Sequence, residues 1–290
     1  GGQVLDLSRP RVMGILNVTP DSFSDGGDYL DREAALSHAR AMVAAGADLI
    51  DVGGESTRPG AAPVGLQDEL ARVVPVIKAL AAELPVPLSI DTCKPDVMTA
   101  AVRAGAGLVN DVMALRAPGA LEVARDLGVP VVLMHMRGEP RTMQVAPRYG
   151  DVVREVRDFL AQRVSDCLAA GIPEGRLILD PGLGFGKTLH HNLALLAGLG
   201  ALTELGRPLL VGLSRKSMLG AITGRGVRER LPASLAAALI AAERGASILR
   251  VHDVAATVDA LKVLEAVRSV GAGTEGQEGH EVECSAGVRR

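Results

Sequence analysis

Aromatic residues are nearly absent from the chain, which has no tryptophan, two tyrosines and three phenylalanines among its 290 residues. Aliphatic side chains must therefore fill any core, because they dominate the 48% of the sequence that is hydrophobic. Each phenylalanine then needs its own explanation. Phe159 lies in an amphipathic helical pattern and is expected in the core. Phe23 and Phe185 lie in polar, glycine-rich loops after apolar runs, so we expect them to serve a binding site.

The chain also lacks a strong charge of either sign, since its formal net charge is −3 at pH 7. This balance argues against nucleic acid as a partner, because such proteins carry a clearly basic surface. No apolar run reaches the roughly 18 residues that a membrane span needs, so no membrane partner is expected. The three cysteines, Cys93, Cys167 and Cys284, are dispersed without metal-ligand spacing, which favours a reducing, cytoplasmic compartment.

Eight apolar, β-branched runs are present instead, and helical patterns separate them. The runs lie at residues 11–17, 48–54, 87–91, 108–112, 130–135, 177–182, 209–216 and 248–253. Strands that are apolar on both faces and alternate with helices indicate a parallel sheet covered by helices. Eight of them predict an α/β fold of the (β/α)8 TIM barrel type. An open doubly wound sheet is the alternative, but it would show G-x-G-x-x-G after the first strand, where the chain reads "NVTPDS".

The expected organisation is a single catalytic barrel domain over residues 12–270. Residues 1–11 form an N-terminal segment, and residues 271–290 are rich in Gly and Glu without periodicity, which predicts a disordered tail. Helical patterns at residues 32–46, 151–171 and 254–267 each have one apolar face toward the sheet. In the second pattern we expect Val156, Leu160 and Leu168 on that face.

Polar residues follow every apolar run. They are Asn17, Asp51, Asp91, Asn110, Asp111, His135, Asp180, Ser214, Arg215, Lys216, Arg250, His252 and Asp253. A single such residue often only caps the next helix. Eight strand ends in succession favour an active site, because barrel enzymes build theirs at the C-terminal mouth from these positions.

The charges at these strand ends predict a mouth with two halves. Basic residues expected near one rim are Arg58, Arg137, Lys187, Arg215, Lys216, Arg250 and His252. Their combined field suits an anion such as a phosphate group. Asp91, Asp111 and Asp180 cannot bind that anion and are suited to a neutral ligand rich in hydrogen-bond donors.

Three other functions can be compared with the sequence: a phosphate loop, a metal-dependent hydrolase site and a Schiff-base lysine. "PGLGFGKT" at residues 181–188 nearly matches the phosphate loop G-x-x-x-x-G-K-T, but Pro181 replaces its first glycine and removes an N–H donor. A metal-dependent hydrolase would need His-x-His on the first strand, where the chain reads "ILN". Lys216 could form a Schiff base if Arg215 and Arg250 lower its pKa, or it could be a fixed hydrogen-bond donor. The residues alone do not separate these last two.

The motifs together resemble the bacterial dihydropteroate synthases, a pterin-binding barrel family. The matching segments are "MGILNVTPDSFSDGG", "DVGGESTRPGA", "SIDTCKP", "VNDV", "LMHMRG", "LDPGLGFGK", "VGLSRKS" and "RVHDV", in order from residue 12 to residue 254. The resemblance implies a transferase of folate biosynthesis and a sulfonamide target. Its reaction condenses 6-hydroxymethyl-7,8-dihydropterin pyrophosphate with p-aminobenzoate to give 7,8-dihydropteroate and pyrophosphate.

The resemblance also implies a role for each site residue. The catalytic residues would be Asp91, Lys216 and Arg250. The pterin would contact Asp91, Asn110, Met134, Asp180, Lys216 and Arg250, the last stacking on the ring. Pyrophosphate would contact Asn17, Thr57, Arg58, Arg250 and His252. The aminobenzoate would contact Phe23, Arg58, Pro59, Phe185 and Ser214. Asn17 would be the protein ligand of Mg²⁺, the expected cofactor.

For the chemistry we expect pyrophosphate to depart first and the arylamine to attack the resulting cationic methylene. A methyltetrahydrofolate–corrinoid methyltransferase would share the pterin pocket and is the alternative enzyme, and a pterin-binding protein without turnover is the alternative outside catalysis. The family resemblance also implies a homodimer, for which the Ala-rich helix at residues 234–246 is one candidate surface.

Overall fold

The computed structural model describes residues 5–18, 27–56, 62–138 and 142–273. Within them eight parallel strands form a closed barrel in the order of the sequence, which confirms the (β/α)8 prediction. The strands are β1 (Arg11–Asn17), β2 (Leu49–Gly53), β3 (Leu88–Asp91), β4 (Leu108–Asp111), β5 (Val131–Met134), β6 (Leu177–Asp180), β7 (Leu209–Val211) and β8 (Ala246–Val251). Every residue of β2 to β7 is buried, because helices cover one face of the sheet and the barrel interior covers the other.

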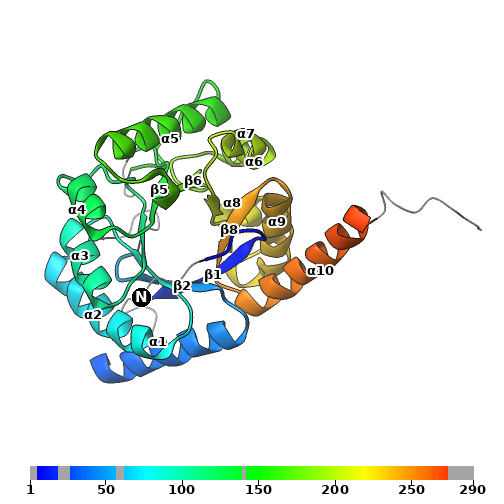
Figure 1. Ribbon diagram of the computed structural model, residues 1–290. Coiled ribbons are helices and arrows are strands. Elements are labelled where there is room, and N and C mark those ends of the chain that lie inside the picture. The colour runs from blue at the N-terminus through cyan, green and yellow to red at the C-terminus, as the bar shows by residue number, and fades with distance from the viewer. Residues whose placement is uncertain (1–4, 19–26, 57–61, 139–141, 274–290) are drawn as a thin grey trace, which may run out of the picture.

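The helices form a ring around these strands, and the C-terminal end of α10 extends beyond that ring (Figure 1). They are α1 (Gly27–Ala44), α2 (Leu66–Glu83), α3 (Pro95–Ala104), α4 (Ala120–Leu127), α5 (Val152–Ala169), α6 (Leu189–Ala197), α7 (Gly200–Thr203), α8 (Ser217–Thr223), α9 (Leu231–Glu243) and α10 (Val254–Gly273). Within the ranges given above, no helix is long and apolar enough to cross a lipid bilayer.

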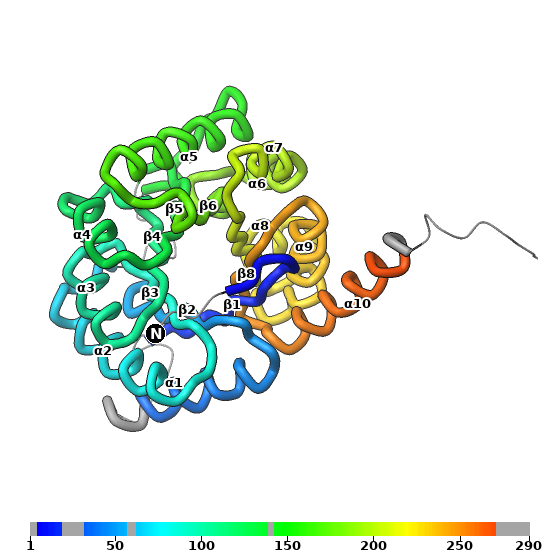
Figure 2. The backbone as a smooth tube through the Cα atoms, viewed as in Figure 1, coloured from blue at the N-terminus to red at the C-terminus, as the bar shows by residue number. Residues whose placement is uncertain are grey.

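The register of the strands brings their polar ends together. β1 closes the barrel against β8, with Met13 opposite Arg250, and Figure 2 shows the two strands side by side. Asp91 pairs with Asn110, and Met134 pairs with Asp180. All carboxyl ends of a parallel barrel face the same way, so these side chains meet at one mouth.

The opposite end of the barrel is filled by aliphatic side chains. One cluster there comprises Met13, Leu49, Leu108, Val132, Ile178, Leu210 and Ile248. Leu5 and Leu7, from the segment before β1, pack against this cluster. The N-terminal segment therefore contributes to the core of the barrel, although its residues show no periodic apolar pattern. No aromatic ring is needed in this cluster, as the composition suggested.

Two features of the helices differ from the sequence-based expectation, namely the buried face of α5 and the end of α10. Leu168 is 42% exposed, and the neighbouring Cys167 is buried in its place. The prediction for Leu168 is wrong because the sheet-facing stripe of α5 passes through Leu160 and Cys167, seven residues apart, which leaves the position after Cys167 outside it. Helix α10 continues to Gly273, three residues into the tail expected at residues 271–290, and the remainder of that tail lies outside the described residues.

Candidate active site

A cavity of about 530 Å³ lies at the C-terminal mouth of the barrel. Most of the site residues named from the sequence line it, namely Asn17, Asp91, Asn110, Met134, Asp180, Phe185, Ser214, Lys216, Arg250 and His252. They come from β1, β3 to β6 and β8, and from the segments that follow β6, β7 and β8. The expected convergence of strand ends on one site is therefore confirmed for these residues.

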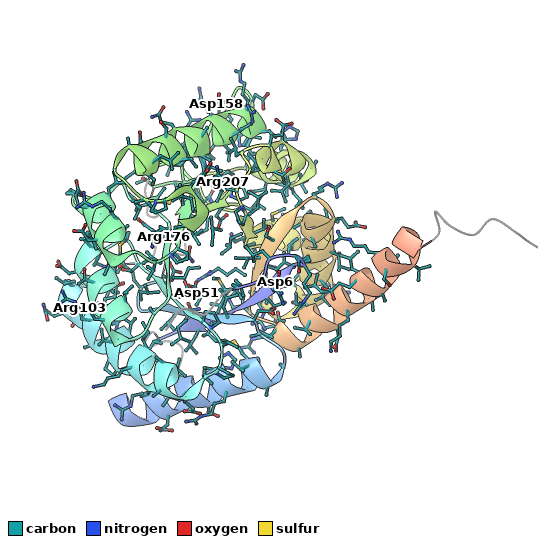
Figure 3. The ribbon with its side chains drawn as sticks, viewed as in Figure 1. Asp6, Asp51, Arg103, Asp158, Arg176 and Arg207 are labelled. Carbon is teal, nitrogen blue, oxygen red and sulfur yellow. The ribbon has the colours of Figure 1, made fainter. Side chains whose placement is uncertain are left out.

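Arg250 lies at the centre of an ionic network in the floor of this cavity. Its Nε donates to Oδ2 of Asp51 at 2.6 Å, and a terminal nitrogen donates to Oδ2 of Asp91 at 2.7 Å. The amide of Asn110 donates to the same oxygen of Asp51 at 3.0 Å. Asp51 thus connects two residues that line the cavity, and Figure 3 places it inside the ring of helices. We named Asp51 only as a strand end, so its role here was missed.

Burial sets the ionisation of this network. It raises the pKa of Asp91, and Asp51 and Asp111 raise it further, whereas Arg250 opposes the shift. Burial disfavours the Arg250 guanidinium, yet Asp51 and Asp91 together hold its pKa above the ordinary value. Among the described side chains, Oδ1 of Asp51 and Oδ1 of Asp91 are buried without a hydrogen-bond partner. A ligand N–H group can satisfy such a buried acceptor.

Asp180 and Lys216 form a second polar group on the other side of the cavity. Oδ1 of Asp180 accepts from the Gly182 N–H at 2.7 Å, and burial raises the pKa of this carboxyl. Lys216 Nζ donates to the Leu183 carbonyl and lies 4.7 Å from the centre of the Phe185 ring. Burial and the Arg250 charge lower the pKa of Lys216 to about 8, against the attraction of Asp180.

Arg215 does not act on Lys216 as proposed from the sequence. Its guanidinium pairs with both oxygens of Asp253, at 2.9 and 2.5 Å. The residue itself has a φ of +58°, in the left-handed region, because the chain turns sharply between β7 and α8. Arg215 still lines the cavity, with its charge balanced by Asp253.

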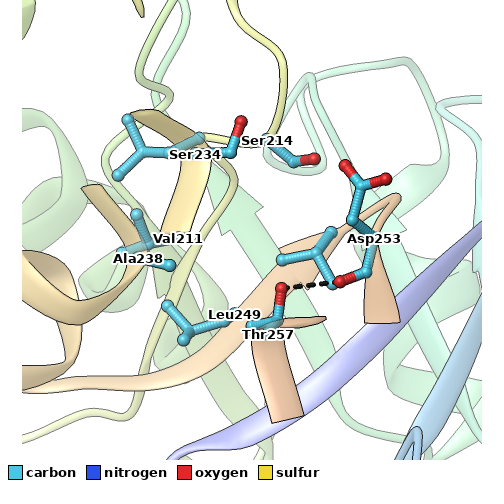
Figure 4. Close-up of a pocket in the computed structure, with 9 residues that line it drawn as sticks. Val211, Ser214, Ser234, Ala238, Leu249, Asp253 and Thr257 are labelled. Carbon is cyan, nitrogen blue, oxygen red and sulfur yellow. Dashed lines mark hydrogen bonds between the residues drawn. The ribbon is translucent and has the colours of Figure 1, made fainter. Parts of the chain in front are cut away.

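Ser214 and His252 are held together at the mouth. The Ser214 hydroxyl accepts from the backbone N–H of His252 at 3.1 Å and lies 3.0 Å from its Nδ1. Behind Ser214 is a second cavity of about 10 Å³, between β7, β8 and α9 (Figure 4). Thr257 donates to the Asp253 carbonyl at its edge, at 2.8 Å. This space is about the size of one water molecule and is too small for a substrate.

Three residues expected at the mouth are engaged elsewhere. Asp111 is fully buried, and its two oxygens accept from the N–H groups of Met113 and Leu115, both at 2.7 Å. It caps a turn and offers nothing to a ligand. Arg137 lies across the Tyr149 ring and pairs with Glu155 at 3.1 Å.

Lys187 is the third of these residues and is only 3% exposed. It is buried beneath the turn that follows β6, so it cannot contribute to a basic rim. The expectation is wrong because the glycine-rich turn folds back over the lysine, which the linear sequence does not show.

Several predicted residues lie outside the described part of the chain. They are Phe23, Thr57, Arg58 and Pro59. Their neighbours Asn17, Glu55 and Ser56 line the cavity. In the residues that the structure describes, no group of three or more His, Cys, Asp or Glu side chains could hold a metal ion. Asn17, the Mg²⁺ ligand that the family resemblance implies, lines the cavity.

Known proteins resemble this chain over most of its length. The sequence profile of a family described as "Pterin binding enzyme" matches residues 13–252. The dihydropteroate synthase of Escherichia coli strain K12 is 54% identical over 268 residues, which cover 92% of this chain and 95% of that one.

Two solved structures are similarly close. A Xanthomonas albilineans dihydropteroate synthase with 4-aminobenzoic acid has a TM-score of 0.87 at 58% identity, covering 91% of this chain and 95% of that one. A Yersinia pestis dihydropteroate synthase in a sulfonamide drug complex has a TM-score of 0.89 at 55% identity, covering 92% and 98%.

Proposed function

The chain belongs to the dihydropteroate synthases, a family of pterin-binding enzymes, and we propose that its barrel mouth performs their condensation with the residues assembled there. The substrates are 6-hydroxymethyl-7,8-dihydropterin pyrophosphate and p-aminobenzoate, and the products are 7,8-dihydropteroate and pyrophosphate. One observation carries the assignment of roles. Acceptor carboxylates, a buried lysine and an aromatic ring line a single cavity of about 530 Å³.

The pterin is assigned to the deep side of the cavity. Its 2-amino group and adjacent ring N–H are donors, and the carboxylate of Asp180 can accept from both. Oδ1 of Asp91 has no hydrogen-bond partner within the described part of the chain, so it can accept from the far side of the ring. Asn110 offers amide contacts, and Lys216 donates to ring N5 and the carbonyl oxygen. Met134 provides an apolar contact.

The pyrophosphate is assigned to the side of the mouth lined by Arg250 and His252. A guanidinium has five N–H donors, and Arg250 uses two of them on Asp51 and Asp91. The remaining donors can face an anion or stack on the pterin. Thr57 and Arg58 are proposed to complete this half. Donors that meet charge growing on the leaving group stabilise the transition state more than the ground state.

Mg²⁺ is proposed to bind with the pyrophosphate. A single amide oxygen from Asn17 fits such an ion, because Mg²⁺ keeps several waters and binds mainly through substrate phosphates. When bound, the ion neutralises charge on the leaving group. Removal of divalent ions with a chelator should abolish turnover while leaving the binding of a pterin without phosphates intact.

The aminobenzoate is assigned to the outer side of the cavity, near Phe185. We propose that Phe23, Pro59 and Phe185 contact its ring, and that Arg58 and Ser214 face its carboxylate. A sulfonamide is expected to compete for the same place, so the inhibitor concentration for half activity should rise in proportion to p-aminobenzoate. Inhibition independent of p-aminobenzoate would contradict this assignment.

The proposed order of bond changes is dissociative. The C–O bond breaks first, pyrophosphate leaves with the electron pair, and the pterin methylene becomes cationic. Asp91 and Asp180 are placed to stabilise that cation electrostatically. The neutral arylamine then forms the C–N bond and loses a proton, so no strong general base is required. Detection of pyrophosphate in a rapid quench without p-aminobenzoate supports this order, and strict dependence of its release on p-aminobenzoate contradicts it.

The decisive experiment is a turnover assay for dihydropteroate with wild type and Asp180→Ala. We expect the variant to lose most of its kcat/KM for the pterin substrate, because both donors of the pterin edge lose their acceptor. Asp166→Ala, a substitution on the outer helix α5, is the matched carboxylate control. Equal pterin KM values in wild type and Asp180→Ala would contradict the pterin assignment.

A cytoplasmic homodimer is proposed as the working form. The described cysteines, Cys93 and Cys167, form no disulfide, which supports a reducing compartment. Helix α9 is rich in alanine and carries the half-exposed Ile240, so it offers a surface for a second copy. Sedimentation equilibrium should give about twice the chain mass, and Ile240→Lys should lower it toward one chain.

A further inference from the structure

The buried amine of Lys187 is not used by the proposed chemistry, and it has a complete set of acceptors. Its Nζ lies 2.8 Å from the Gly182 carbonyl oxygen, 3.1 Å from that of Phe185 and 2.9 Å from Nδ1 of His135. Burial lowers the pKa of Lys187 to about 7, and its charged form has three N–H donors, one for each of these acceptors. Asn192, from α6, contacts the Lys187 carbonyl at 3.3 Å and so holds the backbone of the same residue.

His135 is suited to accept rather than donate in this arrangement. Burial and the neighbouring Lys187 charge lower the pKa of His135 to about 3, so its ring is neutral near pH 7. A neutral imidazole has one nitrogen with a free lone pair, and Nδ1 can present it to the lysine. The Phe159 ring stands edge-on to His135 at 4.9 Å and limits its rotation.

The segment above Lys187 is a tight turn of residues 182–187. Gly182 and Gly186 both have a φ of +63°. A Cβ on Gly182 would lie 1.8 Å from the His135 carbonyl oxygen, and one on Gly186 would lie 2.5 Å from that of Arg137. The turn is therefore pressed against the chain that leaves β5. Two further bonds hold the turn: the Gly184 N–H donates to Oδ1 of Asn192 at 2.6 Å, and the Tyr149 hydroxyl donates to the Gly186 carbonyl at 2.9 Å.

The outer side of this turn contacts the cavity. The carbonyl of Leu183 accepts from Lys216, and the Phe185 ring lies 4.7 Å from the same ammonium. Leu183 and Phe185 flank Gly184, which also lines the cavity. Lys187 thus holds the inner side of the turn. The outer side presents the Phe185 ring and the Leu183 carbonyl to Lys216.

We propose that Lys187 is a positioning residue for p-aminobenzoate: it holds the carbonyls of Gly182 and Phe185 from beneath and so fixes the Phe185 ring beside Lys216. The inference rests on the proposed role of Phe185 in the aminobenzoate site. In this role Lys187 neither binds the anionic leaving group nor acts as the lysine of a phosphate loop. Lys216 also faces Asp180, so the pterin side depends less on the turn.

The test compares Lys187→Met with wild type in two measurements. Methionine keeps an unbranched apolar side chain but removes all three donors. We expect the KM for p-aminobenzoate to rise about tenfold, with kcat and the pterin KM within threefold of wild type. In the ligand-free protein we expect amide hydrogens of residues 182–186 to exchange at least tenfold faster. Lys187→Gln retains an N–H donor and should give intermediate values, and it replaces the methionine variant if that variant does not fold.

Two controls separate this proposal from the proposed function. Arg163→Met removes another buried cation that binds loop carbonyls, those of Ala114 and Leu115, away from the cavity. It should lower stability without changing the p-aminobenzoate KM. Phe185→Ala tests the assigned aminobenzoate contact directly. If Phe185→Ala raises that KM and the Lys187 variants change neither KM nor exchange, the positioning role is wrong. If exchange accelerates while Phe185→Ala leaves the KM unchanged, Lys187 holds the turn, but the contact of Phe185 with p-aminobenzoate is wrong and the positioning role for that substrate is wrong with it.

Discussion

Arg250 illustrates how single residues in this site combine structural and functional roles. Two of its donors bind Asp51 and Asp91 in the cavity floor, which fixes the guanidinium plane and balances its charge. The remaining donors stay available for ligand. A lysine ammonium has three donors and no planar group, so it could not bind both carboxylates and still present a planar face to a ligand. The residue therefore opposes the rise that burial causes in the pKa of Asp91, and it contributes to the field that an anionic leaving group meets.

Lys216 should give the enzyme a basic limb in its binding profile. Its pKa is lowered to about 8, so the ammonium is lost as the pH rises through that value. The affinity for a pterin without phosphates should then fall about tenfold per pH unit above pH 8, measured by titration calorimetry. Lys216→Arg keeps its charge and should move the limb beyond pH 10. An affinity that stays constant from pH 7 to pH 10 in wild type would show that the charge of Lys216 is not needed.

Asp51 should matter for stability as well as for binding. Asp51→Asn removes one of the two carboxylates that balance the buried Arg250 and weakens the acceptor for Asn110. Breaking a buried ion pair costs about 3–5 kcal/mol, so the free energy of unfolding in urea should fall by about that amount. Asp126→Asn, which breaks an exposed pair with Arg125, should leave the urea midpoint unchanged. Equal midpoints for the two variants would contradict the role given to Asp51.

Among the elements, the segment between β6 and α6 carries more of the site than its length suggests. It provides the Gly182 N–H that binds Asp180, the Phe185 ring and the Leu183 carbonyl, and it covers Lys187. Positive φ values at Gly182, Gly184 and Gly186 allow the chain to reverse tightly enough for these contacts. The resemblance of this segment to a phosphate loop reflects the same need for glycine and not the same ligand.

Gly182→Ala should be far more harmful than an alanine at another glycine with the same φ. An alanine in the left-handed region costs about 1–2 kcal/mol. At Gly182 the new Cβ would also meet the His135 carbonyl at 1.8 Å, adding about 1–3 kcal/mol of overpacking. Gly206, with a φ of +67° and no atom within 4 Å of its Cβ position, is the control. Gly182→Ala should have a lower urea midpoint and a higher p-aminobenzoate KM than Gly206→Ala. Similar values for the two variants would contradict the close approach of Gly182 to the His135 carbonyl.

At the scale of the whole molecule, the barrel divides its two ends between stability and chemistry. Aliphatic side chains, including Leu5 and Leu7, fill the N-terminal end. Buried charges gather at the C-terminal end, where Asp51, Asp91 and Arg250 balance one another. The closed sheet makes this separation possible, because it leaves no strand edge to protect and fixes every strand end relative to the others.

The proposal that the folded barrel ends with α10 predicts the effect of two truncations. Among the residues whose burial is described, Leu261 is the last buried one, and Val263, Val267 and Val270 are exposed. Removal of residues 274–290 should leave the urea midpoint and kcat unchanged. Ending the chain at Ala260 removes Leu261 and the partly buried Leu264, and should cost about 1.5–3 kcal/mol for each leucine that was fully buried. A lower midpoint after the shorter truncation would mean that residues 274–290 stabilise the barrel.

The fold could be predicted from the sequence because hydropathy reports burial directly. Strand β1 has the bounds Arg11–Asn17 that its apolar run predicts, since a barrel strand is covered on both faces. Most residues that line the cavity could be named from the sequence, because residues at strand ends converge in this fold whatever their spacing along the chain. Lys187 and Asp111 show where this reasoning fails. Lys187 lies after β6 but is covered by the turn of residues 182–187. Asp111 ends β4, but its side chain binds the N–H groups of the turn that follows.

The sequence by itself determined the barrel, its mouth and the two kinds of ligand that the mouth can take, because these follow from periodicity and from residue type at each strand end. Only the tertiary structure decided which charges face the cavity and which are used internally. That choice depends on backbone turns of a few residues and on pairs such as Asp51 and Arg250, which are 199 positions apart. Such contacts are set by closure of the sheet, and no local pattern encodes them.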